Sequence, residues 1–198
     1  MSSDIFLALV TFGIAMAFTP GPNNIMLAAS GVNFGFSRTV PHISGVAIGF
    51  VFLTFACGVG LGLVFAAMPA LQVALKVAGA TYLLWLAWKV ATAHQGRDDG
   101  KGPARPFTFW QAAAFQWVNP KGLVAALSAV ALYIRPGHLT QDLAVMLLVF
   151  GLITAGSAIT WAGFGVVLRR LLQRPRHARL FNGAMALLLV VSIVPMVV

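Results

Sequence analysis

The stretch ALVTFGIAMAFTPGPNNIMLAAS, residues 8–30, is apolar on both sides of a polar interruption, TPGPNN, at residues 19–24. The whole stretch exceeds the ~20 apolar residues that a helix needs to cross a bilayer. Its two prolines each remove a backbone donor and push away the carbonyl four residues earlier, so the carbonyls of Met16 and Phe18 lose their helical partners. We therefore predict a membrane-spanning helix that breaks at its centre and restarts at the interruption.

A second apolar stretch, residues 109–133, is interrupted in the same way by VNPKG at residues 118–122. Pro120 lies 100 residues after Pro20, about half of the 198-residue chain. By the same chemistry, Pro120 frees the carbonyl of Gln116. The chain therefore resembles three helices written twice, and because three is odd, the second copy crosses the membrane in the opposite sense.

The predicted domain organisation follows from this repeat. Inverted repeats within one membrane domain are a common design of transporters. We predict a single transporter domain, residues 1–198, with repeats at about 1–92 and 108–198 that are joined by a cytoplasmic loop at 93–107.

The composition excludes a water-soluble globular protein. Hydrophobic residues make up 60% of the chain and charged residues only 9%, with a mean hydropathy of +0.91, whereas soluble domains carry about 25% charged residues. Lipid cannot satisfy bare peptide groups, and the apolar runs lack the alternating polarity of barrel strands, so they form helices. The predicted fold class is all-α, a polytopic membrane protein of six transmembrane helices with broken first and fourth helices. The predicted spans are 5–29, 40–66, 70–90, 109–133, 140–168 and 181–197.

The basic residues predict the orientation in the membrane. The chain has 13 lysines and arginines, a net charge of +9, and most of the basic residues fall in the first, third and fifth connections between spans. Positive connections face the cytoplasm, so both termini are predicted to be periplasmic, in a bacterial inner membrane. The same placement argues against nucleic-acid binding, because the positive charge follows the topology of the chain. The residues in these connections are Arg38, Lys89, Arg97, Lys101, Arg105, Arg169, Arg170, Arg174, Arg176 and Arg179.

The two breaks predict a substrate site. A half-helix that starts within the membrane presents free amides and a partial positive charge to an anion, and the carbonyls released by proline suit an ammonium group. Lys121 lies deep in its span, where a cation is costly and usually functional. Structural kinks and a snorkelling lysine are the alternative interpretations. The candidate substrate-binding residues are Pro20, Gly21, Pro22, Asn23, Asn24, Asn119, Pro120 and Lys121.

The sequence lacks the residues that several other classes of function require. The chain has no Asp or Glu in mid-span, its four histidines are dispersed, and Cys57 is its single cysteine. We therefore predict no metal site, no cofactor and no catalytic pair, and a neutral zwitterion fits better than a cationic substrate. A passive channel, a non-transporting membrane subunit and a membrane enzyme or assembly factor are the competing classes.

At these residues the chain resembles the LysE/RhtB family of amino-acid exporters. The resemblance rests on Pro20-Gly21-Pro22, on Asn119-Pro120-Lys121, on the small-residue stretch 44–49 and on residues 75–86. It is most similar to the cysteine/O-acetylserine efflux branch. The resemblance implies secondary efflux of small neutral amino acids or derivatives, driven by the proton gradient. Homoserine, threonine, leucine and basic amino acids are alternative substrates, and homo-oligomerisation is left open.

Overall fold

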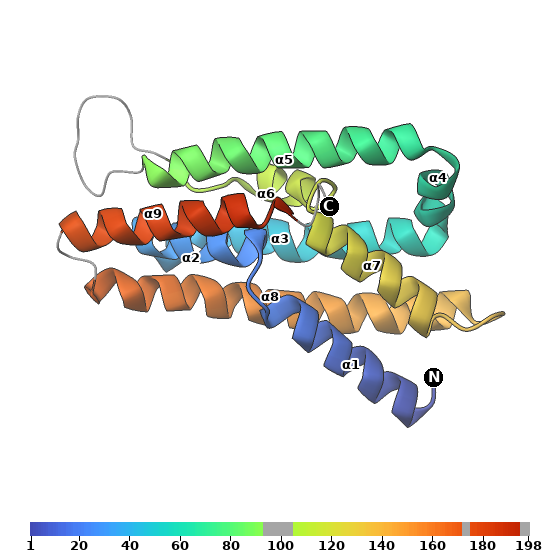
Figure 1. Ribbon diagram of the computed structural model, residues 1–198. Helices are drawn as coiled ribbons and strands as arrows, with labels where there is room; N and C mark the ends of the chain where they lie inside the picture. The colour runs from blue at the N-terminus through green and yellow to red at the C-terminus, as the bar shows by residue number, and fades with distance from the viewer. Residues whose placement is uncertain (93–104, 172–174, 195–198) are drawn as a thin grey trace.

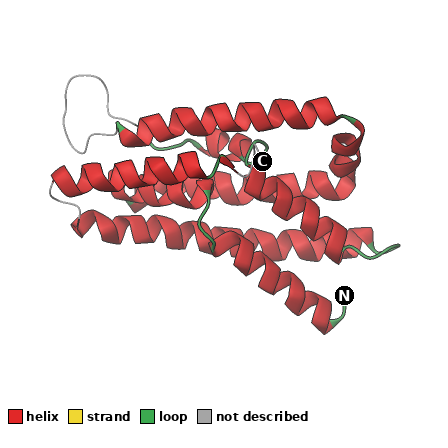
Figure 2. Ribbon diagram, in the orientation of Figure 1, coloured by secondary structure: helices red, strands yellow, loops and turns green. Residues whose placement is uncertain are grey.

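The computed structural model describes residues 1–92, 105–171 and 175–194 of the chain. All regular structure in these described residues is helical, as Figure 2 shows. The prediction of an all-helical membrane protein is confirmed. The elements are α1 (Ser3–Phe18), α2 (Pro22–Phe34), α3 (Phe36–Ala56), the wider helical turn η1 (Cys57–Leu61), α4 (Gly62–Ala67), α5 (Pro69–Ala91), α6 (Phe109–Phe115), α7 (Pro120–Tyr133), α8 (Leu139–Leu171) and α9 (Pro175–Val191).

Three helical segments are long and apolar enough to cross a membrane, namely Phe36–Gly60, Val73–Ala91 and Leu139–Arg169. Helices α1 and α2 together make a fourth, bent by 53° at their break. Helices α7 and α9 are apolar but shorter. Length and composition thus support three or four spans among the described residues, and the six-span inverted repeat remains a prediction.

The second predicted span differs from the observed one. We expected one helix at 40–66, but α3 ends at Ala56 and the chain turns through η1 into the short α4. Gly60 in this turn has φ 120°, in the region that glycine adopts readily and other residues avoid. The glycines of this stretch indicate a break in the helix, whereas the high hydropathy of residues 40–66 favoured a single span.

Other boundaries shift by smaller amounts. The sixth predicted span, 181–197, is preceded in the structure by a helical turn, because α9 starts at Pro175, a favourable first residue for a helix. Helix α9 ends at Val191, about midway along the bundle (Figure 1). Most of the predicted loop 93–107, residues 93–104, lies outside the described residues.

The ends of the bundle differ in charge. The start of α3, the ends of α5 and α8 and the start of α9 lie together at one end (Figure 1), and they carry Arg38, Lys89, Arg169 and Arg176. At the opposite end, Asp142 in the first turn of α8 accepts hydrogen bonds from Arg135, in the turn before this helix, from Nη2 at 2.8 Å and from Nε at 2.9 Å. This ion pair raises the pKa of the Arg135 guanidinium. The charge asymmetry agrees with the predicted orientation, which remains a prediction.

Glycines allow the central helices to cross closely. A Cβ added to Gly165 of α8 would overlap the carbonyl of Ala28 in α2, and one added to Gly31 of α2 would overlap the carbonyl of Ala162 in α8. Small residues of this kind let helix backbones approach each other within a membrane. This packing places α2 against the C-terminal half of α8, and the first break contacts Ser157, near the middle of that helix.

Candidate functional site

The first break separates α1 from α2 about midway along the bundle (Figure 1). Gly21 precedes α2 in an extended conformation, and Pro22 occupies the first helical turn, where its missing amide costs nothing. The amide of Ile25 donates to the Gly21 carbonyl at 3.0 Å and closes that turn. A new helix N-terminus therefore begins here, as the two prolines predicted.

The carbonyls at the end of α1 find side-chain partners. Asn24 Nδ2 donates to Ala17 O at 2.7 Å and to Thr19 O at 2.9 Å. Ser157 Oγ, from α8, donates to the same Ala17 carbonyl at 2.7 Å. We expected Met16 and Phe18 to be the freed carbonyls, and the Met16 carbonyl does accept a side-chain hydrogen bond, from Thr19 Oγ1 at 3.2 Å. The Ala17 and Thr19 carbonyls also take side-chain partners, because α1 stops at Phe18 and the chain then becomes extended.

The second break lies between α6 and α7, residues 116–119. Asn119 is extended and precedes α7, which begins at Pro120. Gln116 is fully buried in the break. Its side-chain amide exchanges two hydrogen bonds with the Asn23 amide, at 2.8 and 3.2 Å. The two breaks, 93 residues apart in sequence at this contact, are therefore joined directly.

Lys121 makes a second connection between the breaks. Its ammonium, on the first turn of α7, donates to Thr19 O at 2.6 Å and to Thr19 Oγ1 at 2.7 Å. A longer contact of 3.5 Å reaches Pro20 O. The stem of Lys121 passes Gly21 so closely that an added Cβ there would lie 2.8 Å from Lys121 Cδ. The side chain thus points to the end of α1.

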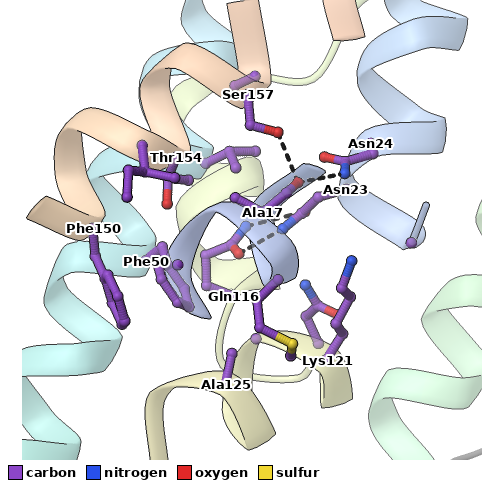
Figure 3. Close-up of a pocket in the computed structure, with 18 of the residues that line it drawn as sticks. Ala17, Asn23, Asn24, Phe50, Gln116, Lys121, Ala125, Phe150, Thr154 and Ser157 are labelled. Carbon is purple, nitrogen blue, oxygen red and sulfur yellow. Dashed lines mark hydrogen bonds between the residues drawn. The ribbon is translucent and has the colours of Figure 1, made fainter. Parts of the chain in front are cut away.

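A pocket lies where the breaks meet, and Figure 3 shows its lining side chains. It holds about 70 Å³, several times the 10–15 Å³ that one water requires. Six of the eight candidate residues line it: Gly21, Pro22, Asn23, Asn24, Asn119 and Lys121. Pro20 and Pro120 instead line a neighbouring crevice, which also contacts Lys121 and the end of α9.

Comparison with known proteins identifies the family of the chain. A family model described as LysE type translocator matches residues 14–194. The chain belongs to the LysE translocator family. It is 34% identical over 197 residues to the cysteine/O-acetylserine efflux proteins of Escherichia coli strain K12 and Shigella sonnei strain Ss046, with 96% of this chain and of each relative covered. No solved structure matches the chain.

Membership of the LysE family settles the class of function. A translocator moves a solute across a membrane, so this LysE protein is a membrane transporter and not an enzyme. The resemblance found in the sequence is thereby confirmed, and it extends over nearly the whole chain.

Residues outside the sequence prediction complete the pocket of this LysE protein. Gln116 and Ser157, both buried, hold the first break from α6 and α8. Phe50 and Phe150 line the side of the pocket opposite Lys121 and Asn24 (Figure 3). A polar side chain within an apolar run was the available signal for Gln116 and Ser157, whereas nothing in the sequence distinguishes the two phenylalanines from others.

The polar groups of the pocket have complementary roles. Lys121 and the start of α2 supply positive charge and unpaired amides, which favour an anion. Asn119 Oδ1 is buried and has no hydrogen-bond partner among the described residues. An unpaired buried acceptor is costly, so it suits a site that receives a donor from a ligand. Among the described residues that line the pocket, none is acidic.

Proposed function

We propose that this LysE translocator exports small neutral amino acids or their derivatives across the bacterial inner membrane, and that the substrate zwitterion binds between the two breaks. The observation that carries the proposal is the Lys121 ammonium, which reaches from α7 to the end of α1 within a pocket. Burying an ammonium group deep in a membrane span costs free energy, and a negatively charged group of the ligand offsets that cost.

The substrate carboxylate is assigned to the positive side of the pocket. Within the part of the chain that the structure describes, the partners of Lys121 Nζ are neutral oxygens of Thr19 and Pro20. A carboxylate forms a stronger, charge-assisted hydrogen bond and can replace those partners. The first turn of α2, with the amides of Asn23 and Asn24, adds the helix dipole on the same side.

The substrate ammonium is assigned to Asn119. Its buried Oδ1 has no hydrogen-bond partner among the described residues, and an ammonium group supplies three donors. With no acidic side chain among the described lining residues, a second positive charge on the substrate would stay unpaired, at a large desolvation cost. This argument favours neutral amino acids over lysine or arginine.

The relatives support the substrate class. Two of them are named cysteine/O-acetylserine efflux proteins, at 34% identity. Cysteine and O-acetylserine are small neutral zwitterions, and no acidic side chain lines the pocket among the described residues. Homoserine, threonine and leucine belong to the same chemical class and are included in the test below.

For the transport cycle we propose alternating access between two inverted repeats. The basic ends of α5 and α8 face the cytoplasm, substrate enters from that side, and the repeats then rock about the breaks to open to the periplasm. The proton gradient supplies the energy. In this scheme both termini are periplasmic.

Reconstituted protein tests the proposal. Proteoliposomes loaded with one unlabelled amino acid should take up the labelled form by counterflow, with saturable kinetics for cysteine, O-acetylserine, serine and homoserine and little uptake of lysine. Imposing a pH gradient should accelerate net transport. Uptake that does not saturate and ignores the gradient would favour a channel, and the absence of counterflow for every neutral amino acid would refute the proposal.

A further inference from the structure

We infer that Gly13 sets the size of a side-chain subsite at the apolar end of the pocket, and that this subsite selects neutral amino acids with short side chains. The inference rests on the transport function proposed above. It concerns the part of the pocket farthest from the charged and amide groups.

Three phenylalanines form this apolar end. Phe12 of α1, Phe50 of α3 and Phe150 of α8 all line the pocket. The ring of Phe150 lies between the other two, with centroids 5.9 Å from Phe50 and 6.4 Å from Phe12 and interplanar angles of 26° and 24°. Phe150 is only 2% exposed. Because the Phe150 ring is buried and stacks against both other rings, it has little freedom to move and forms the wall of the pocket at this end.

The position of the wall determines which part of a substrate it contacts. Figure 3 shows Phe50 and Phe150 on the side of the pocket opposite Lys121 and Asn24. A zwitterion whose carboxylate meets Lys121 and whose ammonium meets Asn119 directs its side chain away from those groups. The substrate side chain therefore faces the phenylalanines, which offer no hydrogen bonds and accept methyl, thiol or short ester groups.

Gly13 lets the side chains of Phe150 and Ile153 pack directly against α1. A Cβ added to Gly13 would lie 3.0 Å from Phe150 Cε1 and 3.0 Å from Ile153 Cδ1. All three residues line the pocket. Because the neighbours of an added methyl must shift by a few tenths of an ångström, alanine at this position narrows the subsite. The glycine thus determines how long a substrate side chain the pocket accepts.

The uncharged lining of this end restricts the class of accepted substrates further. Among the described residues at this end of the pocket, Phe12, Phe50, Phe150 and Ile153 offer no counter-charge. An ionised side chain placed against them would lose its hydration without a partner. Aspartate, glutamate and lysine are therefore rejected by the same subsite that accepts short neutral side chains.

The test compares two substrates within each variant, so that expression level cancels. Counterflow rates of norvaline and alanine are measured in proteoliposomes for wild type, Gly13→Ala and Phe150→Leu. One methylene in a hydrophobic pocket changes discrimination by about tenfold or more. We expect the norvaline-to-alanine ratio to fall about tenfold in Gly13→Ala and to rise in Phe150→Leu, which enlarges the subsite. Gly156→Ala is the matched control, because an added methyl there meets no atom within 4 Å.

The outcomes separate the two proposals. A wild-type ratio in both Gly13→Ala and Phe150→Leu, with alanine still transported, overturns the subsite and leaves the transport function intact. If Gly13→Ala does not fold, the ratio in Phe150→Leu decides the question. If wild type transports cysteine but neither alanine nor norvaline, the subsite is overturned and the transport function stands. Absence of counterflow by wild type for every neutral amino acid, cysteine included, overturns the proposed function itself.

Discussion

Replacing Lys121 with methionine removes the ammonium and keeps the volume of its stem. In the structure this ammonium makes two short hydrogen bonds, 2.6 and 2.7 Å, to Thr19. A hydrogen bond to a charged group contributes about 1.5–3 kcal/mol, which corresponds to about a 10- to 150-fold change in affinity. The ammonium must release Thr19 before it binds a carboxylate, so the loss of substrate affinity should fall near the lower end of this range. We therefore expect KM to rise about tenfold in Lys121→Met.

The fold should tolerate this change. The Thr19 carbonyl keeps its bond from Asn24 Nδ2 at 2.9 Å when Lys121 is replaced, so the melting temperature in detergent should change little. Lys76→Met is the matched control, because Lys76 is an exposed lysine of α5 that lines neither described pocket. Counterflow kinetics over a range of substrate concentrations give KM for both variants. A wild-type KM in Lys121→Met would refute a carboxylate-binding role.

Three further changes test the scaffold around the site. Gln116→Leu leaves the Asn23 amide without its partner, which costs about 1–3 kcal/mol of folding free energy. This variant should have a lower melting temperature and a higher KM. An unchanged KM would show that the amide pair has no part in substrate binding. Gly165→Ala drives a methyl into the carbonyl of α2 and should abolish the yield of folded protein in size-exclusion chromatography, while Gly163→Ala, with no atom within 4 Å of its added methyl, should elute as wild type. Asp142→Asn breaks the ion pair between Asp142 and Arg135 and should lower the melting temperature without altering KM, since neither residue lines the pocket.

The sequence by itself determined the features that follow from short-range chemistry. Apolar runs in a chain with few charges must be helices in lipid, and prolines at positions 20 and 120 interrupt helices through steric effects that act within four residues. Both breaks are found where the prolines predicted them. The depth of Lys121 in the membrane remains a prediction, because it rests on the count of residues from the ends of the predicted span 109–133.

Only the tertiary structure decided how distant segments meet. The pairing of Gln116 with Asn23 and the contact of Lys121 with Thr19 join residues 93 and 102 apart in sequence. The position of Gln116 depends on the close packing of α6 on α3, where a Cβ added to Gly45 would overlap the carbonyl of Phe109 and one added to Gly49 would lie 3.0 Å from Gln116 Cγ. The order of residues along the chain does not show which atoms a side chain contacts on a neighbouring helix. The packing of helices selects those partners, because each polar group buried in the membrane takes whichever partner the neighbouring helix presents.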